Sequence, residues 1–80
     1  MPEFELSKHT RDMLVEREIP EEWVWRVIEN PDKRRRGPDG NFHFTKRIRE
    51  RGGRVLRVVV NSDVSPNRIV TVFFDRRLSK

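Results

Sequence analysis

The chain has 80 residues, which is the length of one small domain and leaves no room for a second hydrophobic core. It contains no cysteine, which excludes a disulfide framework and a thiolate metal site. The formal net charge is +5, but the charges are separated along the chain: residues 1–32 carry −5 and residues 33–80 carry +10. A basic half of this kind attracts polyanions.

No segment resembles a targeting or membrane-spanning sequence. The first five residues are acidic at Glu3 and Glu5, whereas a signal peptide begins with basic and then apolar residues. An apolar run such as Val58–Val60 is far shorter than the ~20 residues that span a bilayer. The sequence therefore predicts a soluble cytoplasmic domain with no membrane contact, and it leaves the oligomeric state open.

The acidic half predicts two helices. Ser7 is a good N-cap for a first helix over about 8–17, in which the apolar residues follow helical spacing. Pro20 suits the start of a second helix over about 20–29. That helix ends before Pro31, because the residue that precedes a proline avoids the helical region.

Beyond Pro31 the apolar residues alternate with polar ones, which is typical of strands. Turn signals rich in glycine and proline separate the alternating segments. Because helices precede strands, we expect an α+β fold with two N-terminal helices packed on one face of a four-stranded antiparallel sheet. The predicted strands cover about 33–36, 41–48, 54–61 and 68–75 of a single domain, 1–80.

The alternation also divides the sheet into two faces. If the aromatic residues of the first long strand point inward, the face under the helices collects Phe42, Phe44, Leu56, Val58, Val60, Val70, Val72 and Phe74. The opposite face then collects His43, Thr45, Arg47, Val55, Arg57, Val59, Ile69, Thr71 and Phe73. A sheet face with cations and an aromatic ring can bind single-stranded RNA.

Arginines dominate the cations of the basic half, and the planar guanidinium binds phosphate in a two-pronged manner. An alternative for the densest run, Lys33–Arg36, is a solubilising edge strand whose charges discourage pairing with other chains. The residues predicted to bind nucleic acid are Arg34, Arg35, Arg36, Arg47, Arg57 and Arg68.

Two histidines are the candidate catalytic residues, together with Arg57. An imidazole titrates near neutral pH, so His9 or His43 can take the proton of an RNA 2′-hydroxyl while Arg57 stabilises the phosphorane. The structural alternatives are that His9 fixes the first helix to the sheet and that His43 lies on the surface. No metal site is predicted, because two histidines without carboxylates at ligand spacing do not form one, and no cofactor is implied.

The acidic half offers a second kind of surface. Trp23 and Trp25 are two residues apart on a predicted helix, so they cannot both point straight into the core. A partly exposed tryptophan beside Glu21, Glu22 and Glu29 would suit a protein partner. The alternative is that both rings pack at the edges of the helix.

Several short segments resemble one family. Ser7-Lys8-His9 with Met13, then Glu16–Pro20, Asn30-Pro31-Asp32, the Gly40 turn and Ile69–Phe73 are similar to the domain of unknown function 4258 family, from about Phe4 to Asp75. That family is similar to RelE-like and BrnT-like toxins, which implies a RelE-like fold, cleavage of messenger RNA and an antitoxin partner. The resemblance maps the family's histidine to His9 and its arginine before the inter-helix turn to Arg17. Glu18 stands where glycine is usual, and the sheet lacks the tyrosine of many RelE-like nucleases.

These observations lead to two hypotheses. The first is an RNA-interacting, toxin-like domain that acts as a metal-independent endoribonuclease and pairs with an antitoxin or another protein. The second is a non-catalytic small interaction module that binds a protein through its acidic helical half.

Overall fold

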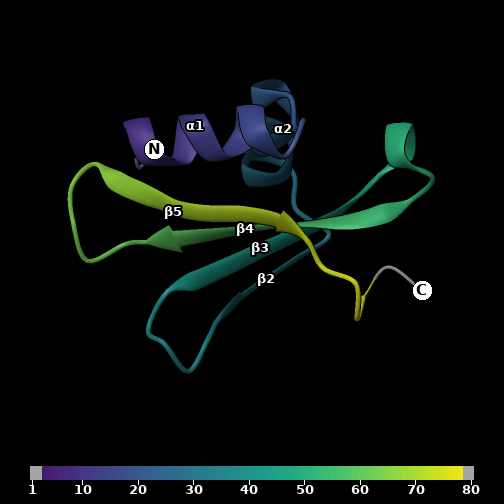
Figure 1. Cartoon of the computed structure of the whole chain (residues 1–80). Helices are drawn as coiled ribbons and strands as arrows, with labels where there is room; N and C mark the ends of the chain where they lie inside the picture. Colours follow the sequence, from purple (N-terminus) through teal and green to yellow (C-terminus); the bar gives the residue numbers. More distant parts are fainter. Residues whose placement is uncertain (1–2, 79–80) are drawn as a thin grey trace.

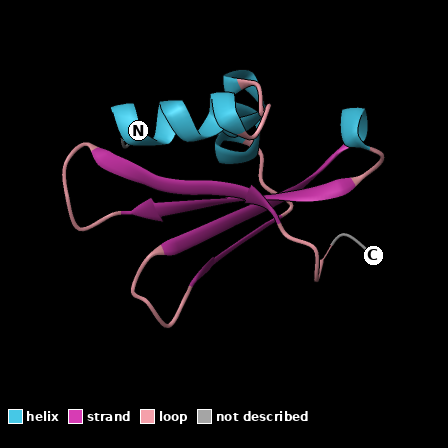
Figure 2. Cartoon of the chain, in the orientation of Figure 1, coloured by secondary structure: helices cyan, strands magenta, loops and turns pink. Residues whose placement is uncertain are grey.

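Two helices lie on one face of a five-stranded mixed sheet, which makes the protein an α+β fold (Figures 1 and 2). The computed structural model describes residues 3–78. None of the helices in these residues is long and apolar enough to cross a bilayer. In chain order the elements are β1 (Phe4–Leu6), α1 (Lys8–Glu16), α2 (Glu21–Glu29), β2 (Lys33–Arg36), β3 (Phe42–Ile48), a 3₁₀ turn (Arg49–Arg51), β4 (Arg54–Asn61) and β5 (Asn67–Phe74).

The first helix begins and ends with well-known capping arrangements. At its start the Ser7 hydroxyl accepts the amide of Thr10 at 3.1 Å. At its end Glu18 adopts a left-handed conformation with φ of 56°, and the Ile19 amide reaches back to the Leu14 carbonyl at 2.9 Å. This is a Schellman motif, and the accompanying apolar contact is made by Ile19 and Leu14, which are both buried.

The second helix covers the middle of the sheet. Glu21 and Glu22 lie in its first turn, where carboxylates complement the partial positive charge of the helix N-terminus. Trp23 is buried and stacks edge-on against Phe74 at the end of β5. Trp25 is only half buried, and its indole nitrogen lies 3.3 Å from Glu21.

The sheet has the order β1-β5-β4-β3-β2. The expectation of four antiparallel strands was wrong, because β1 adds a fifth strand that pairs parallel to β5, with Leu6 opposite Ile69. A three-residue strand has no periodicity to detect, and its partner lies at the other end of the chain. The remaining strands form an antiparallel meander.

A β-bulge corrects the predicted faces of the last strand. Val59 pairs with Thr71, but Val60 pairs with Ile69, so Val70 is an extra residue in the ladder. The bulge turns Ile69 toward the helices, where it is fully buried, while Val70 is only half buried. The prediction that Val70 points inward and Ile69 outward was therefore wrong. The buried cluster between helices and sheet consists of Leu6, Leu14, Ile19, Trp23, Val24, Val27, Phe44, Ile48, Leu56, Val58, Val60, Ile69 and Val72.

Candidate nucleic-acid interface

The sheet face that points away from the helices carries a row of polar side chains across three neighbouring strands. Because Phe44 belongs to the core, its neighbour His43 must point to the opposite side of the sheet. In the sheet His43 of β3 lies opposite Arg35 of β2. Arg57 of β4 lies opposite Phe73 of β5 on the same face. We call this side the open face; its residues are Lys33, Arg35, His43, Thr45, Arg47, Val55, Arg57, Val59, Thr71 and Phe73.

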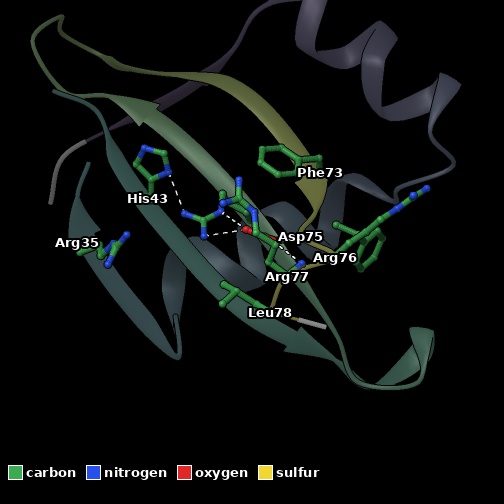
Figure 3. Close-up of a pocket in the computed structure, with 9 residues that line it drawn as sticks. Arg35, His43, Phe73, Asp75, Arg76, Arg77 and Leu78 are labelled. Atoms are coloured by element: carbon green, nitrogen blue, oxygen red, sulfur yellow. Dashed lines mark hydrogen bonds and ion pairs between the residues drawn. The ribbon is translucent and has the colours of Figure 1, made fainter. Parts of the chain in front are cut away.

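Arg57 is the centre of a hydrogen-bonded network on the open face, and its bonds to the labelled residues His43 and Asp75 are drawn as dashed lines in Figure 3. Its Nε donates to Oδ2 of Asp75 at 2.9 Å, and its Nη2 lies 2.8 Å from the same oxygen. Its Nη1 lies 3.0 Å from Nδ1 of His43. The side chains of Arg57 and Asp75 are only 16% and 11% exposed, so solvent screens this ion pair less than a surface pair.

The contacts of His43 define its tautomer. A guanidinium only donates hydrogen bonds, so Nδ1 of His43 must accept from Arg57 and carries no proton. The proton of the neutral ring is therefore on Nε2, which lies 3.2 Å from both carboxylate oxygens of Asp39. The four side chains thus form a chain of hydrogen bonds in the order Asp39, His43, Arg57 and Asp75.

The turn between β2 and β3 closes tightly over His43. A Cβ atom at Gly37 would lie 2.6 Å from Nε2 of His43 and 2.8 Å from Oδ1 of Asp39. Only a glycine leaves room for the imidazole and the carboxylate to meet at this position.

The two carboxyl groups are held in their charged forms. Burial on its own raises the pKa of Asp75, but hydrogen bonds from Arg57 and from the Arg77 amide outweigh it and lower the pKa below its ordinary value. The amide of Asn41 is the main cause that lowers the pKa of Asp39, followed by the hydrogen bond with His43. Both residues therefore remain carboxylates at neutral pH.

An open cleft of about 620 Å³ lies beside this network. Four arginines and one aspartate give its wall a positive charge, and the half-buried ring of Phe73 forms part of its surface (Figure 3). The lining residues are Arg35, His43, Arg57, Phe73, Phe74, Asp75, Arg76, Arg77 and Leu78. A cleft of this character can hold a phosphate and stack a base.

The cleft is part of a domain whose family is identified by its sequence. The model of the family described as Domain of unknown function (DUF4258) matches residues 6–74. The chain belongs to the DUF4258 family. No curated protein and no solved structure matches it. The matched region includes Asp39, His43 and Arg57, whereas Asp75 and the two arginines after it follow its end.

Of the residues predicted to bind nucleic acid, only Arg35 and Arg57 line the main cleft of this DUF4258 domain. Arg34 and Arg36 point to the helix side of the sheet, where they stack on the ring of Phe42 at 5.8 and 5.6 Å. Arg47 is on the open face but donates to the Gly53 carbonyl at 2.9 Å, at a smaller hollow of about 130 Å³. Arg68 lies 3.6 Å from Glu5 at the far end of β5.

The two histidines are on opposite sides of the molecule. His9 is exposed on α1, so the sheet separates it from the cleft that contains His43. Arg17, the other residue mapped by family resemblance, donates from Nη1 to the Val72 carbonyl at 2.8 Å. Within residues 3–78 no cluster of three or more histidine, cysteine, aspartate or glutamate side chains could hold a metal ion.

The sequence did not single out four residues of this site. Arg76 and Arg77 were visible as a basic segment after the last strand, which was the available signal. Asp39 appeared only as a turn residue, and Asp75 only as the end of a strand. Their roles depend on the strand register, which brings a turn and a strand end to the same imidazole–guanidinium pair.

Proposed function

We propose that this DUF4258 protein is a cytoplasmic RNA-binding domain related to RelE-like and BrnT-like toxins. It binds single-stranded RNA in the cleft on the open face and cleaves it there without a metal ion. The observation that carries the proposal is the placement of Arg57, which Asp75 and His43 hold in the lining of a cleft that contains further arginines.

Binding is supported by the charge and the shape of the cleft. Arg35, Arg76 and Arg77 are exposed and can each neutralise a phosphate, with a salt-dependent gain in affinity. Phe73 offers a ring on which one base can stack. Single-stranded RNA fits better than a duplex, because only unpaired bases can be splayed onto an aromatic ring.

The reaction that we propose uses His43 as the base. When an RNA phosphate draws Arg57 away, Nδ1 of His43 loses its hydrogen-bond donor and its lone pair becomes available. Nδ1 then takes the 2′-hydroxyl proton, and the 2′-oxygen attacks phosphorus while Arg57 stabilises the charge of the phosphorane. The bond from phosphorus to the 5′-oxygen breaks, and a water molecule protonates that oxygen. Asp39 accepts the hydrogen bond from Nε2–H of His43, and its negative charge stabilises the imidazolium.

Fluorescence anisotropy with a labelled single-stranded RNA at ~100 mM salt tests binding. We expect Arg57→Ala to weaken binding at least about tenfold, and the double variant Arg76→Ala/Arg77→Ala, which leaves the buried pair intact, to weaken it by a similar factor. Arg68→Ala is the matched control, because it removes one exposed arginine outside the cleft. Equal losses in all three variants would mean that net charge alone attracts RNA.

Incubation with RNA in EDTA, followed by analysis of the product ends, tests cleavage. The proposed reaction leaves a 2′,3′-cyclic phosphate and a 5′-hydroxyl. We expect His43→Gln to lower the cleavage rate at least about a hundredfold while binding persists, because general-base catalysis contributes 10²–10⁴-fold to the rate. His9→Ala tests the other histidine: loss of cleavage in His9→Ala alone would assign the base to α1. Binding without any cleavage would leave an RNA-binding module.

A further inference from the structure

The two edges of the sheet differ in how their backbone groups are covered. Along the β5 edge, where β1 pairs only with Asn67–Ile69, side chains of the first helical segment donate hydrogen bonds to backbone carbonyls. Thr10 Oγ1 donates to the Ile69 carbonyl at 3.0 Å, and Arg17 Nη1 donates to the Val72 carbonyl at 2.8 Å. At the opposite edge, β2 is the last strand, and all of its residues are exposed.

The backbone of β2 presents hydrogen-bonding groups to the outside of the sheet. The amide of Gly37 donates to the Asn41 carbonyl at 2.8 Å, which identifies residues 35 and 37 as the positions that face β3. In an antiparallel pair these positions alternate, so the N–H and C=O groups of Arg34 and Arg36 point out of the edge. A strand added at this edge would pair with both residues.

The side chains of β2 place positive charge on both faces of that edge. Lys33 and Arg35 point to the open face, and Arg34 and Arg36 point to the helix side. The ring of Phe42 supports both of the latter guanidinium groups. An added strand would therefore meet cations with every side chain, whichever face that side chain occupies.

This combination selects one kind of partner. A second copy of the chain would bring the same four cations against β2 and would be repelled. RNA would satisfy the charges, but its phosphates only accept hydrogen bonds and cannot match the alternating donors and acceptors of a strand. An extended peptide matches the backbone, and acidic side chains match the charge.

We propose that the β2 edge binds an extended acidic peptide segment as a sixth strand of the sheet. The main-chain hydrogen bonds are made with Arg34 and Arg36, and the carboxylates of the peptide pair with Lys33–Arg36 on both faces. This interaction shares Arg35 with the RNA cleft, but its main-chain hydrogen bonds use Arg34 and Arg36, which do not line that cleft, so either proposal can fail without the other.

The probe is an eight-residue peptide with blocked ends in which Glu-Glu-Val-Val is repeated, so that glutamates reach both faces of the edge, and the control is the same peptide N-methylated at alternate residues. We expect the unmodified peptide to protect the amides of Arg34 and Arg36 from hydrogen exchange and the methylated peptide to bind at least about tenfold more weakly. Equal binding of the two peptides would overturn strand addition. Protection of these amides by single-stranded RNA, with none from the peptide, would assign the edge to nucleic acid.

A pair of protein variants separates the backbone contribution from the charge. Arg34→Pro removes one outward N–H at an edge position that tolerates proline, and Arg34→Gln removes the same charge but keeps the N–H. We expect Arg34→Pro to lose at least about tenfold in affinity and Arg34→Gln about two- to fivefold. Equal losses would contradict the proposal. If Arg34→Pro disturbs the fold, Arg34→Glu/Arg36→Glu serves instead, with preference expected to change to the same peptide with lysine in place of glutamate.

Discussion

A single residue at the end of the first helix carries a conformational cost. Glu18 is the one described residue other than glycine with a positive φ, and at 56° its Cβ is crowded by its own backbone. The Schellman motif requires this conformation, since the Ile19 amide must turn back to the Leu14 carbonyl. The position therefore favours glycine on physical grounds.

We predict that Glu18→Gly raises the free energy of unfolding by about 0.5–1 kcal/mol. Relief of the left-handed strain, worth about 1–2 kcal/mol, exceeds the extra backbone entropy that glycine gains in the unfolded chain. Urea titration followed by tryptophan fluorescence measures the change. Glu16→Gly, at the last right-handed residue of the helix, is the control and should lose up to about 1 kcal/mol. A loss at both positions would contradict the prediction.

Gly37 determines the geometry of the imidazole in the cleft. We predict that Gly37→Ala displaces His43, because the new Cβ would lie 2.6 Å from Nε2. The displacement should cost about 1–3 kcal/mol of stability, as overpacking does elsewhere. NMR of the His43 ring nitrogens should show that the bonds to Asp39 and Arg57 are lost. Pro38→Ala, in the same turn, should leave these signals unchanged; unchanged signals in Gly37→Ala would refute the clash.

The alternation of residues along the strands predicted the positions of His43 and Arg57 in the network, but not those of Asp39 and Asp75. His43 and Arg57 could be assigned to the open face because residues alternate along a strand and Phe44 had to be buried. Asp39 and Asp75 lie in a turn and at a strand end, where alternation gives no direction. Their positions follow from pairing between strands, which a one-dimensional pattern does not contain.

At the level of elements, α1 is attached to the sheet by a buried hydroxyl. Thr10 is fully buried, and its Oγ1 donates to the Ile69 carbonyl while lying 3.0 Å from the Ser7 hydroxyl. The same side chain thus links the helix cap to the bulged segment of β5. An apolar replacement of similar shape would leave the Ile69 carbonyl without this donor.

We predict that Thr10→Val lowers the free energy of unfolding by about 1–3 kcal/mol, which is the cost of an unsatisfied buried acceptor. Chemical denaturation measures the loss. The matched control is Thr71→Val: its hydroxyl lies 3.5 Å from the Met13 sulfur, a weak acceptor, in a half-buried position. That change should cost less than about 0.5 kcal/mol. Similar losses at the two positions would show that the Thr10 hydroxyl has no special role.

The elements with strong periodicity could be predicted, and those without it could not. The helical spacing before Pro31 and the alternation after it correspond to α1, α2 and the antiparallel meander. β1 has three residues and gains its strand conformation only from β5. The bulge at Val59/Val60 shifts the register by one residue, and nothing in the local alternation marks it.

At the scale of the whole molecule, an ion pair and arginine hydrogen bonds join the helices to the sheet and its turns. Arg26 of α2 donates from both terminal nitrogens to the carboxylate of Glu50, each at 2.9 Å, and so links the helix to the turn between β3 and β4. Arg17 and Arg51 add links to backbone carbonyls across the same boundary. Carboxylates in such positions make stability depend on pH.

We predict that acid destabilises the protein mainly between about pH 4 and 2. The hydrogen bond from Arg26 is the main cause that lowers the pKa of Glu50 to about 2, and the pKa values of Asp32, Asp39 and Asp75 are also below their ordinary values. A group whose pKa is lower in the folded state stabilises that state above its unfolded pKa and loses this contribution as the pH falls through the folded value. Urea midpoints should therefore fall as the pH drops below about 4. Glu50→Gln should reduce the fall below pH 4, whereas equal falls in the two proteins would show that the Arg26–Glu50 pair contributes nothing to acid sensitivity.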